Sequence, residues 1–70
     1  MINIRLDHVL LDRRMKLKDL AKATGIAVNN LSILKTNKAR AIRFSTLEAL
    51  CKALDCGAGD LIEFVPDDKD

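Results

Sequence analysis

The chain has 70 residues, of which 49% are hydrophobic and 31% are charged, and its formal net charge is +2. A chain of this length forms one small domain and buries only about 60% of the surface that it exposes when unfolded. It contains two Phe and neither Trp nor Tyr, which disfavours proteins that stack single-stranded or RNA bases on aromatic rings. No apolar stretch is long enough for a membrane span or a signal-peptide core, so we expect a cytoplasmic protein with reduced thiols.

The positive charge is concentrated in the first part of the chain. Residues 1–43 contain ten Lys or Arg and three Asp, a net charge of +7, whereas residues 44–70 contain two Lys and seven acidic residues, a net charge of −5. No acidic residue lies between Leu20 and Leu47, a stretch that holds Lys22, Lys35, Lys38, Arg40 and Arg43. A run of charge is usually a solvated surface, but a basic stretch free of acids favours nucleic acid as a partner.

The first residues predict a strand followed by a helix. Ile2 and Ile4 alternate with polar residues, which is typical of a half-buried strand. Residues 6–14 then predict a helix that places four residues on one side: Leu6, Val9, Leu10 and Arg13. His8 lies on this helix without a Cys, a second His or a carboxylate cluster beside it, so we interpret it as an exposed or half-packed side chain.

Residues 17–36 predict two short helices joined by a tight turn. Four residues recur at the i, i+3, i+4, i+7 spacing of one helix face: Leu17, Leu20, Ala21 and Thr24. Gly25 follows, where the helix must stop and the chain must adopt a positive φ. We expect Ile26 to turn toward the core and a second helix to run from Val28 to Thr36, with Leu31 and Leu34 facing inward. This arrangement is typical of a helix-turn-helix, whose second helix can present its outer side chains to the major groove.

The next segment contains a further helix start. We expect Asn37 to end the second helix in the left-handed conformation, and Ala41 and Ile42 to tuck inward from the loop that follows. Ser45 and Glu48 fit the S-x-x-E capping box, with Phe44 as a hydrophobic staple, which predicts a helix that begins at Ser45. Its core face is predicted from the repeat of Leu47, Leu50, Cys51 and Leu54.

The remaining residues predict a helical turn, a strand and a tail. Cys51 and Cys56 fit no zinc-binding spacing, so we interpret both as small buried hydrophobes and expect no metal and no cofactor. Residues 59–61 predict one helical turn, residues 62–65 a strand that ends at Pro66, and residues 67–70 a frayed acidic tail. Because an isolated two-stranded hairpin is marginal in water, we expect the terminal strands to pair with each other over the helices or across a dimer.

Taken together, these segments resemble the Xre-like, Cro/repressor family of bacterial and phage helix-turn-helix proteins over about residues 5–65. The resemblance is carried by Leu20-Ala21, Thr24-Gly25-Ile26, Leu31-Ser32, Leu34-Lys35, Lys38, the segment IRFSTLEALCKALDC (Ile42–Cys56) and Gly59–Leu61. It implies a mostly α, five-helix, lambda-repressor-like domain over residues 1–66, with the helix-turn-helix at 17–36 and room for a small two-stranded sheet from the termini. It further implies a transcriptional regulator, with repression as the expected sense, that binds double-stranded DNA as a homodimer in the bacterial or phage nucleoid, without a small-molecule ligand.

The resemblance also implies which residues contact DNA. The base-reading positions of the family fall on Val28, Asn29, Ser32 and Ile33. Asn29 can bind adenine N6 and N7, Val28 and Ile33 can pack on thymine methyl groups, and Ser32 can donate or accept at a base edge. Phosphate contacts, which fix register without reading sequence, are expected from Lys35, Thr36, Lys38, Arg40 and Arg43.

Four positions depart from the family pattern. Leu17 stands where Gln is frequent, Ala27 where Ser or Thr caps the second helix, Ile33 where a polar or basic residue is frequent, and Asn37 where Gly is usual. The alternative function is therefore a protein-interaction module on the same scaffold, antitoxin-like or a dimeric adaptor, that uses the face bearing Ile33. We reject an enzyme because the sequence has no Gly-rich phosphate loop, no Cys–His or Ser–His–Asp set and no metal-ligand spacing.

Overall fold

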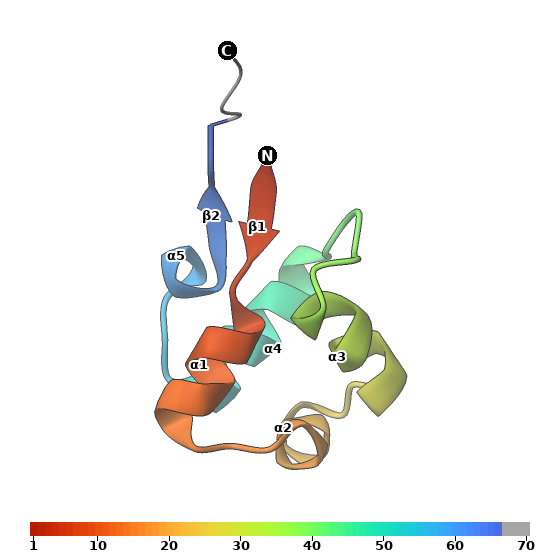
Figure 1. Ribbon diagram of the computed structural model, residues 1–70. Coiled ribbons are helices and arrows are strands. Elements are labelled where there is room, and N and C mark those ends of the chain that lie inside the picture. Colours follow the sequence, from red (N-terminus) through yellow and green to blue (C-terminus); the bar gives the residue numbers. More distant parts are fainter. Residues whose placement is uncertain (67–70) are drawn as a thin grey trace.

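The computed structural model describes residues 1–66 as a small helical domain with a two-stranded sheet (Figure 1). The elements are, in order, β1 (Ile2–Ile4), α1 (Leu6–Arg13), α2 (Leu17–Thr24), α3 (Val28–Lys35), α4 (Phe44–Leu54), α5 (Ala58–Leu61) and β2 (Ile62–Phe64). The predicted mostly α fold with a terminal sheet is thus confirmed, while the expected tail at 67–70 lies outside the described residues. None of the helices in residues 1–66 combines the length and apolarity that a membrane crossing requires.

The two strands join the ends of the described chain. β1 and β2 pair antiparallel, with Ile2 opposite Phe64, Asn3 opposite Glu63 and Ile4 opposite Ile62. They form a ribbon that projects from one end of the helical body (Figure 1). Pairing of the termini within one chain confirms the first of the two predicted arrangements.

Leucines from all five helices form the core. Six of them are at most 2% exposed: Leu6, Leu20, Leu31, Leu50, Leu54 and Leu61. Each lies at a position that the apolar periodicity predicted to face inward or at the end of the short α5 turn. Arg13 adds a polar clamp between α1 and the end of α4, because its Nε donates to the Leu54 carbonyl (2.7 Å) and Nη2 to that of Asp55 (3.0 Å).

A three-residue turn connects α2 to α3. Gly25 ends α2 at φ 76°, and its N–H donates to the Ala21 carbonyl at 2.8 Å. No heavy atom lies within 4 Å of a Cβ built at this glycine, so the backbone conformation rather than space requires it. The Thr24 hydroxyl donates to the Leu20 carbonyl (2.8 Å) and accepts from the N–H of Ile26 (3.2 Å), which fixes the turn that aims α3.

The segment after α3 differs from the prediction in its details. α3 ends at Lys35, one residue earlier than expected, and Asn37 is left-handed as predicted, at φ 61°. Ile42 packs against the core as expected, but the prediction for Ala41 was wrong because this residue is exposed. Ala39 packs inward instead, and a single methyl group carries too little apolar area for the sequence to distinguish the two alanines.

The predicted start of α4 was also wrong. Arg43, with extended φ −76° and ψ 147°, is the N-cap, and no side chain caps the helix. Ser45 therefore lies inside the first turn and cannot act as the cap, which requires a non-helical backbone. Phe44 is 88% exposed rather than packed as a staple, and Glu48 instead pairs with Lys52 at 3.5 Å.

The side chain of Asn37 ties the end of α3 to β1. Its Oδ1 accepts from the N–H of Ile4 (2.9 Å) and its Nδ2 donates to Oδ1 of Asn3 (2.9 Å). Asn3 in turn donates to Oε2 of Glu63 on β2 at 2.7 Å. A chain of polar contacts thus connects the helix-turn-helix with both terminal strands.

Candidate nucleic-acid interface

The two sides of α3 differ in burial. Leu31 is fully buried and Leu34 is 6% exposed, whereas Val28 and Ile33 are 45% and 46% exposed. Asn29 is exposed as well, and Ser32 is half-buried at the edge of this face. The structure therefore brings the four predicted base-reading residues together along one side of a helix held to the core by the other.

The N-terminus of α3 has no side-chain cap. Ala27 occupies the N-cap position with an extended backbone, φ −62° and ψ 141°. Its carbonyl accepts from the N–H groups of Asn30 (3.0 Å) and Leu31 (3.1 Å). Because Ala has no side-chain acceptor, the first N–H groups of α3, which carry the positive end of the helix dipole, are left to solvent or a ligand.

The predicted phosphate-contacting cations surround the C-terminal half of α3. Lys35, Lys38, Arg40 and Arg43 are all exposed, and none of them forms an ion pair within residues 1–66. Thr36 differs because its hydroxyl lies 2.9 Å from the Ser32 carbonyl and 3.3 Å from that of Ile33. Its proton is thus engaged within α3, which leaves the oxygen as an acceptor rather than a donor for phosphate.

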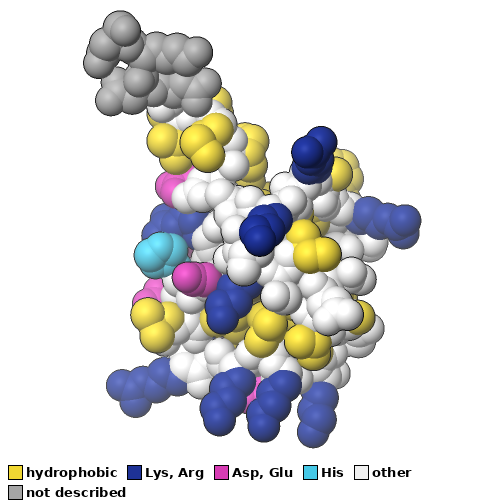
Figure 2. All heavy atoms as spheres, turned by 45° about the vertical axis from the view of Figure 1, so that its right-hand side comes forward, with side chains coloured by type: hydrophobic (Ala, Val, Ile, Leu, Met, Phe, Trp, Pro, Cys, Tyr) yellow, Lys and Arg dark blue, Asp and Glu magenta, His cyan; other side chains and the backbone are white. Residues whose placement is uncertain are grey.

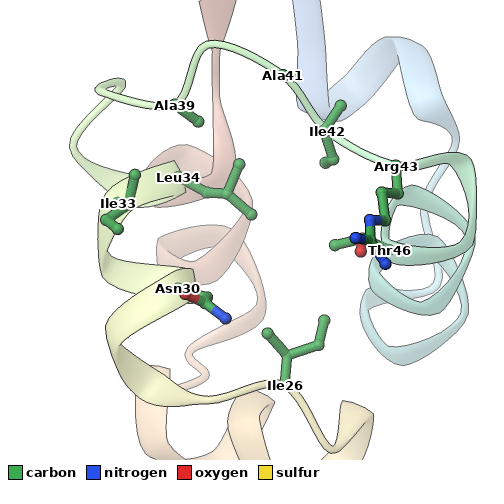
Figure 3. A pocket seen from close by; sticks show the side chains of 9 residues that line it. All are labelled: Ile26, Asn30, Ile33, Leu34, Ala39, Ala41, Ile42, Arg43 and Thr46. Carbon is green, nitrogen blue, oxygen red and sulfur yellow. The ribbon is translucent and has the colours of Figure 1, made fainter.

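A hollow of about 240 Å³ separates α3 from the start of α4. Figure 3 shows Asn30 on its α3 side and Arg43 and Thr46 on its α4 side, with Ile33 at the rim beside the base-reading face. The first turn of α4 borders this hollow, and its N–H groups have no side-chain acceptor. An uncapped helix start next to an arginine is a favourable place for an anion.

Sequence reasoning missed two parts of this surface. The uncapped start of α4 was missed because the S-x-x-E pattern assigned the cap to Ser45. Lys16 and Lys18 at the start of α2 are exposed and were not among the predicted phosphate contacts. Figure 2 shows Lys and Arg side chains gathered along the edge of the molecule near α2, and the spacing Lys16-x-Lys18 at the start of α2 was the available signal.

The cysteines and His8 lie outside this surface. Cys51 and Cys56 are free, half-buried and packed against the core, so they are less deeply buried than predicted. Burial, followed by the nearby Cys51 and Asp60, raises the pKa of the Cys56 thiol above its ordinary value of 9.0. Within residues 1–66, His, Cys, Asp and Glu form no group of three or more that could hold a metal ion.

An exposed helix that follows a glycine turn, with unpaired cations around it, defines a helix-turn-helix DNA-binding domain. The family model for the Cro/C1-type HTH DNA-binding domain matches residues 5–67, and the chain belongs to this family. This confirms the predicted resemblance and places the protein among helix-turn-helix transcriptional regulators.

Known proteins agree with this assignment. The chain is 51% identical over 67 residues to YozG of Bacillus subtilis (strain 168), an uncharacterized HTH-type transcriptional regulator, and the match covers 96% of this chain and 80% of YozG. The solved structure of the transcriptional regulator VanUg is 31% identical, with a TM-score of 0.75 over 94% of this chain and 87% of VanUg. A solved protein from Bacteroides fragilis shares the fold at 24% identity, with a TM-score of 0.80 over 90% of this chain and all of that one.

Proposed function

We propose that this protein is a cytoplasmic, homodimeric transcriptional repressor that reads the major groove of a specific double-stranded DNA site with α3. The observation that carries the proposal is the exposed side of α3, opposite Leu31 and Leu34, inside a stretch of basic residues without acids. A protein-binding role does not require such a charge distribution, whereas a polyanionic duplex does.

Base recognition is assigned to the exposed side of α3. Asn29 lies in the first turn of α3. Its side-chain amide can donate to N7 of adenine and accept from the N6 amino group, which makes a bidentate contact. Val28 and Ile33 suit thymine methyl groups, and Ser32 suits a base edge of either kind. The exposure of Val28 and Ile33, close to half in each case, supports apolar contacts as part of the recognition.

Phosphate binding is assigned to the cations that follow α3. Lys35, Lys38, Arg40 and Arg43 have no competing carboxylate within residues 1–66, so their charge is available to the DNA backbone. The open first turn of α4 beside Arg43 adds N–H donors for one phosphate. Thr36 was predicted in the same set, but its engaged hydroxyl gives that assignment the least support.

The experiment is selection from mixed duplex fragments, followed by affinity measurements on the retained fragment across a salt series. Four neutralised phosphates predict a slope of log K against log salt of about −3 to −4 for one subunit and about twice that for a dimer. Half-sites about 34–36 Å apart are expected for a dimer. A steep slope with one fragment retained at high salt supports a specific regulator, and a flat response refutes DNA binding.

Two variants separate sequence recognition from charge. Asn29→Ala is expected to cost about 1–3 kcal/mol on the selected site and to relax the preference at one base pair. Lys38→Ala is expected to weaken binding to all sequences equally and to reduce the salt slope by about 1. Lys52→Ala is the matched control, since Lys52 lies on α4 and already pairs with Glu48. An unchanged sequence preference in Asn29→Ala would show that α3 does not read DNA through this residue.

The second candidate is a protein-interaction module, favoured by the two exposed aliphatic side chains on α3. Val28 and Ile33 lie five positions apart, about 1.4 helical turns, and flank the exposed side of α3, where each can make an apolar contact with a partner protein. In that case DNA binding is weak or absent, and Ile33→Lys abolishes capture of the partner rather than of DNA.

A further inference from the structure

Cys51 and Cys56 occupy two joined positions of the turn that ends α4. The helix ends at Leu54, and Asp55 follows in the left-handed conformation at φ 51°. The N–H of Cys56 then donates to the Cys51 carbonyl at 3.1 Å. This is the outer hydrogen bond of a Schellman motif, in which the side chains of the two joined positions frequently pack against each other. Both cysteines are free, and both pack against the same leucine core.

The 3.1 Å hydrogen bond limits how far apart the two cysteines lie. Even if all the atoms between them were in a straight line, standard bond lengths would place the two Cα atoms only about 7 Å apart. The bends at the carbonyl oxygen and at the amide nitrogen bring this distance into the range of about 4.4–6.8 Å that disulfides span. The backbone therefore holds Cys51 and Cys56 within reach of a disulfide.

A polar hollow of about 160 Å³ gives a small molecule access to one of the two thiols. Water occupies about 30 Å³ in the liquid, and hydrogen peroxide is only slightly larger, so the hollow admits it easily. Cys56 lines the hollow together with Val9 and five polar side chains: Arg5, His8, Asp12, Arg13 and Asp60. Cys56 is thus the thiol that an oxidant in the hollow meets first.

We propose that hydrogen peroxide oxidises Cys51 and Cys56 to an intramolecular disulfide, which fastens the end of α4 to the turn that leads into α5. Disulfides in a reducing cytoplasm are usually transient and redox-sensing, so thiol reductants are expected to reopen this one. The pair then acts as a site of reversible oxidation, separate from the exposed side of α3. This inference does not depend on the proposed DNA binding.

The oxidation balances in two steps. In the first, the Cys56 sulfur attacks one oxygen of the peroxide: an S–O bond forms, the O–O bond breaks, and the other oxygen leaves with the thiol proton as water. In the second, the Cys51 sulfur attacks the sulfenic acid on Cys56: the S–S bond forms, the S–O bond breaks, and the hydroxyl leaves with the Cys51 proton as water. The two thiols lose two electrons and two protons, and the peroxide is reduced to water.

The charges around Cys56 set the speed of the first step. Arg13 lies beside this thiol, held by two carbonyls at the end of α4, and its guanidinium favours the thiolate. Burial, the Cys51 thiol and the Asp60 carboxylate outweigh it and raise the pKa of Cys56. Because the thiolate is the form that attacks, oxidation is expected to be slow at neutral pH and to accelerate as the pH rises toward that pKa. The pair therefore responds to sustained rather than brief exposure.

Peptide mapping of the full chain tests the bond. The reduced chain is exposed to hydrogen peroxide, its remaining thiols are blocked with a maleimide, and it is digested with trypsin without reduction. Trypsin cleaves after Arg43 and Lys52, so the two cysteines fall on different peptides, residues 44–52 and the peptide that begins at Ala53. We expect these two peptides to be linked, and the intact chain to lose two hydrogens and bind no maleimide. Oxygen atoms added to both cysteines without a link, or disulfides between separate chains, overturn the proposal.

Single variants test the order of the two steps. In Cys51→Ser the sulfenic acid has no thiol to resolve it, so dimedone is expected to label Cys56. In Cys56→Ser the thiol that lines the hollow is gone, and the remaining thiol is expected to disappear at least fivefold more slowly. Dimedone labelling in Cys56→Ser alone, or faster thiol loss in that variant, overturns Cys56 as the attacking thiol.

Urea unfolding tests whether the native turn fits the bond. The disulfide is expected to raise the unfolding midpoint, because it constrains the unfolded chain while the native turn already holds the cysteines at the required distance. The matched control is the double variant Cys51→Ser/Cys56→Ser treated with the same peroxide, which measures the effect of methionine oxidation alone. A midpoint of the disulfide form below that of the reduced chain, after this correction, overturns the proposal. No assay here contains DNA, so failure leaves the proposed DNA binding standing.

Discussion

Replacing Asn37 separates the contribution of its side chain from that of its backbone. The side chain makes two hydrogen bonds with β1, to Ile4 N–H and to Asn3, and both are exposed to solvent. Each is therefore expected to contribute about 0.5 kcal/mol, the lower end for a protein hydrogen bond. Asn37→Gly loses both but adopts φ 61° without strain, so the free energy of unfolding should fall by about 1 kcal/mol.

Asn37→Ala loses the same bonds and must also hold the left-handed conformation, which costs about 1–2 kcal/mol for a residue that lacks the short polar side chain by which Asn tolerates it. Its total cost is therefore about 2–3 kcal/mol. Urea unfolding of wild type and both variants at one pH measures the two differences. If Gly and Ala cost the same, the backbone conformation contributes nothing, and if Gly stabilises the protein, the two hydrogen bonds do not hold α3 to β1.

Three further predictions concern the turn, the cap and the thiol. Gly25→Ala should cost about 1–2 kcal/mol in urea unfolding, since φ is 76° but no atom would clash with the added Cβ, and a much larger loss would show that space is limiting. Ala27→Ser should raise the free energy of unfolding by about 1 kcal/mol, because the extended N-cap of α3 lacks a side-chain acceptor, and an unchanged midpoint would contradict the cap geometry. Burial raises the pKa of Cys56 above 9.0, so the native state holds a proton that the unfolded chain releases. The stability from this group is present below pH 9 and lost as the pH rises through the native pKa. Urea midpoints should thus fall more steeply above pH 9 in wild type than in Cys56→Ala, and equal slopes would refute this.

Apolar periodicity was sufficient to predict the core and the orientation of α3. Leu20, Leu31 and Leu50 each present a large apolar side chain at helical spacing, and burial of such area decides which side of a helix faces inward. The same spacing placed Asn29 and Ile33 on the outer side, because residues that are not on the core side of an amphipathic helix are exposed. The predicted core and the predicted outer side of α3 both depend only on the pattern of residues within a few positions along the chain.

Features that depend on tertiary contacts were not predictable in this way. The S-x-x-E pattern at Ser45 is a local signal, whereas in the structure Ile42 packs against the core and the chain enters α4 at Phe44, with Arg43 as the N-cap. The role of Asn37 in closing the edge of β1 joins residues 33 positions apart. The hollow beside Arg43 follows from the same misassigned helix start, so the candidate site was predicted on α3 and missed on α4.

The pairing of β1 with β2 has a consequence for the order in which the chain folds during synthesis. Asn3 and Glu63 are 60 positions apart, whereas the contacts among α2, the turn and α3 are local. Local contacts form early and distant pairings late, because closing a long loop costs entropy before any contact repays it. During synthesis β1 cannot pair until β2 has been made, by which time residues 17–35 of the helix-turn-helix have already been synthesised. The terminal ribbon therefore exists only on chains that have been synthesised past β2, and a translation product interrupted before β2 carries the helix-turn-helix without the ribbon.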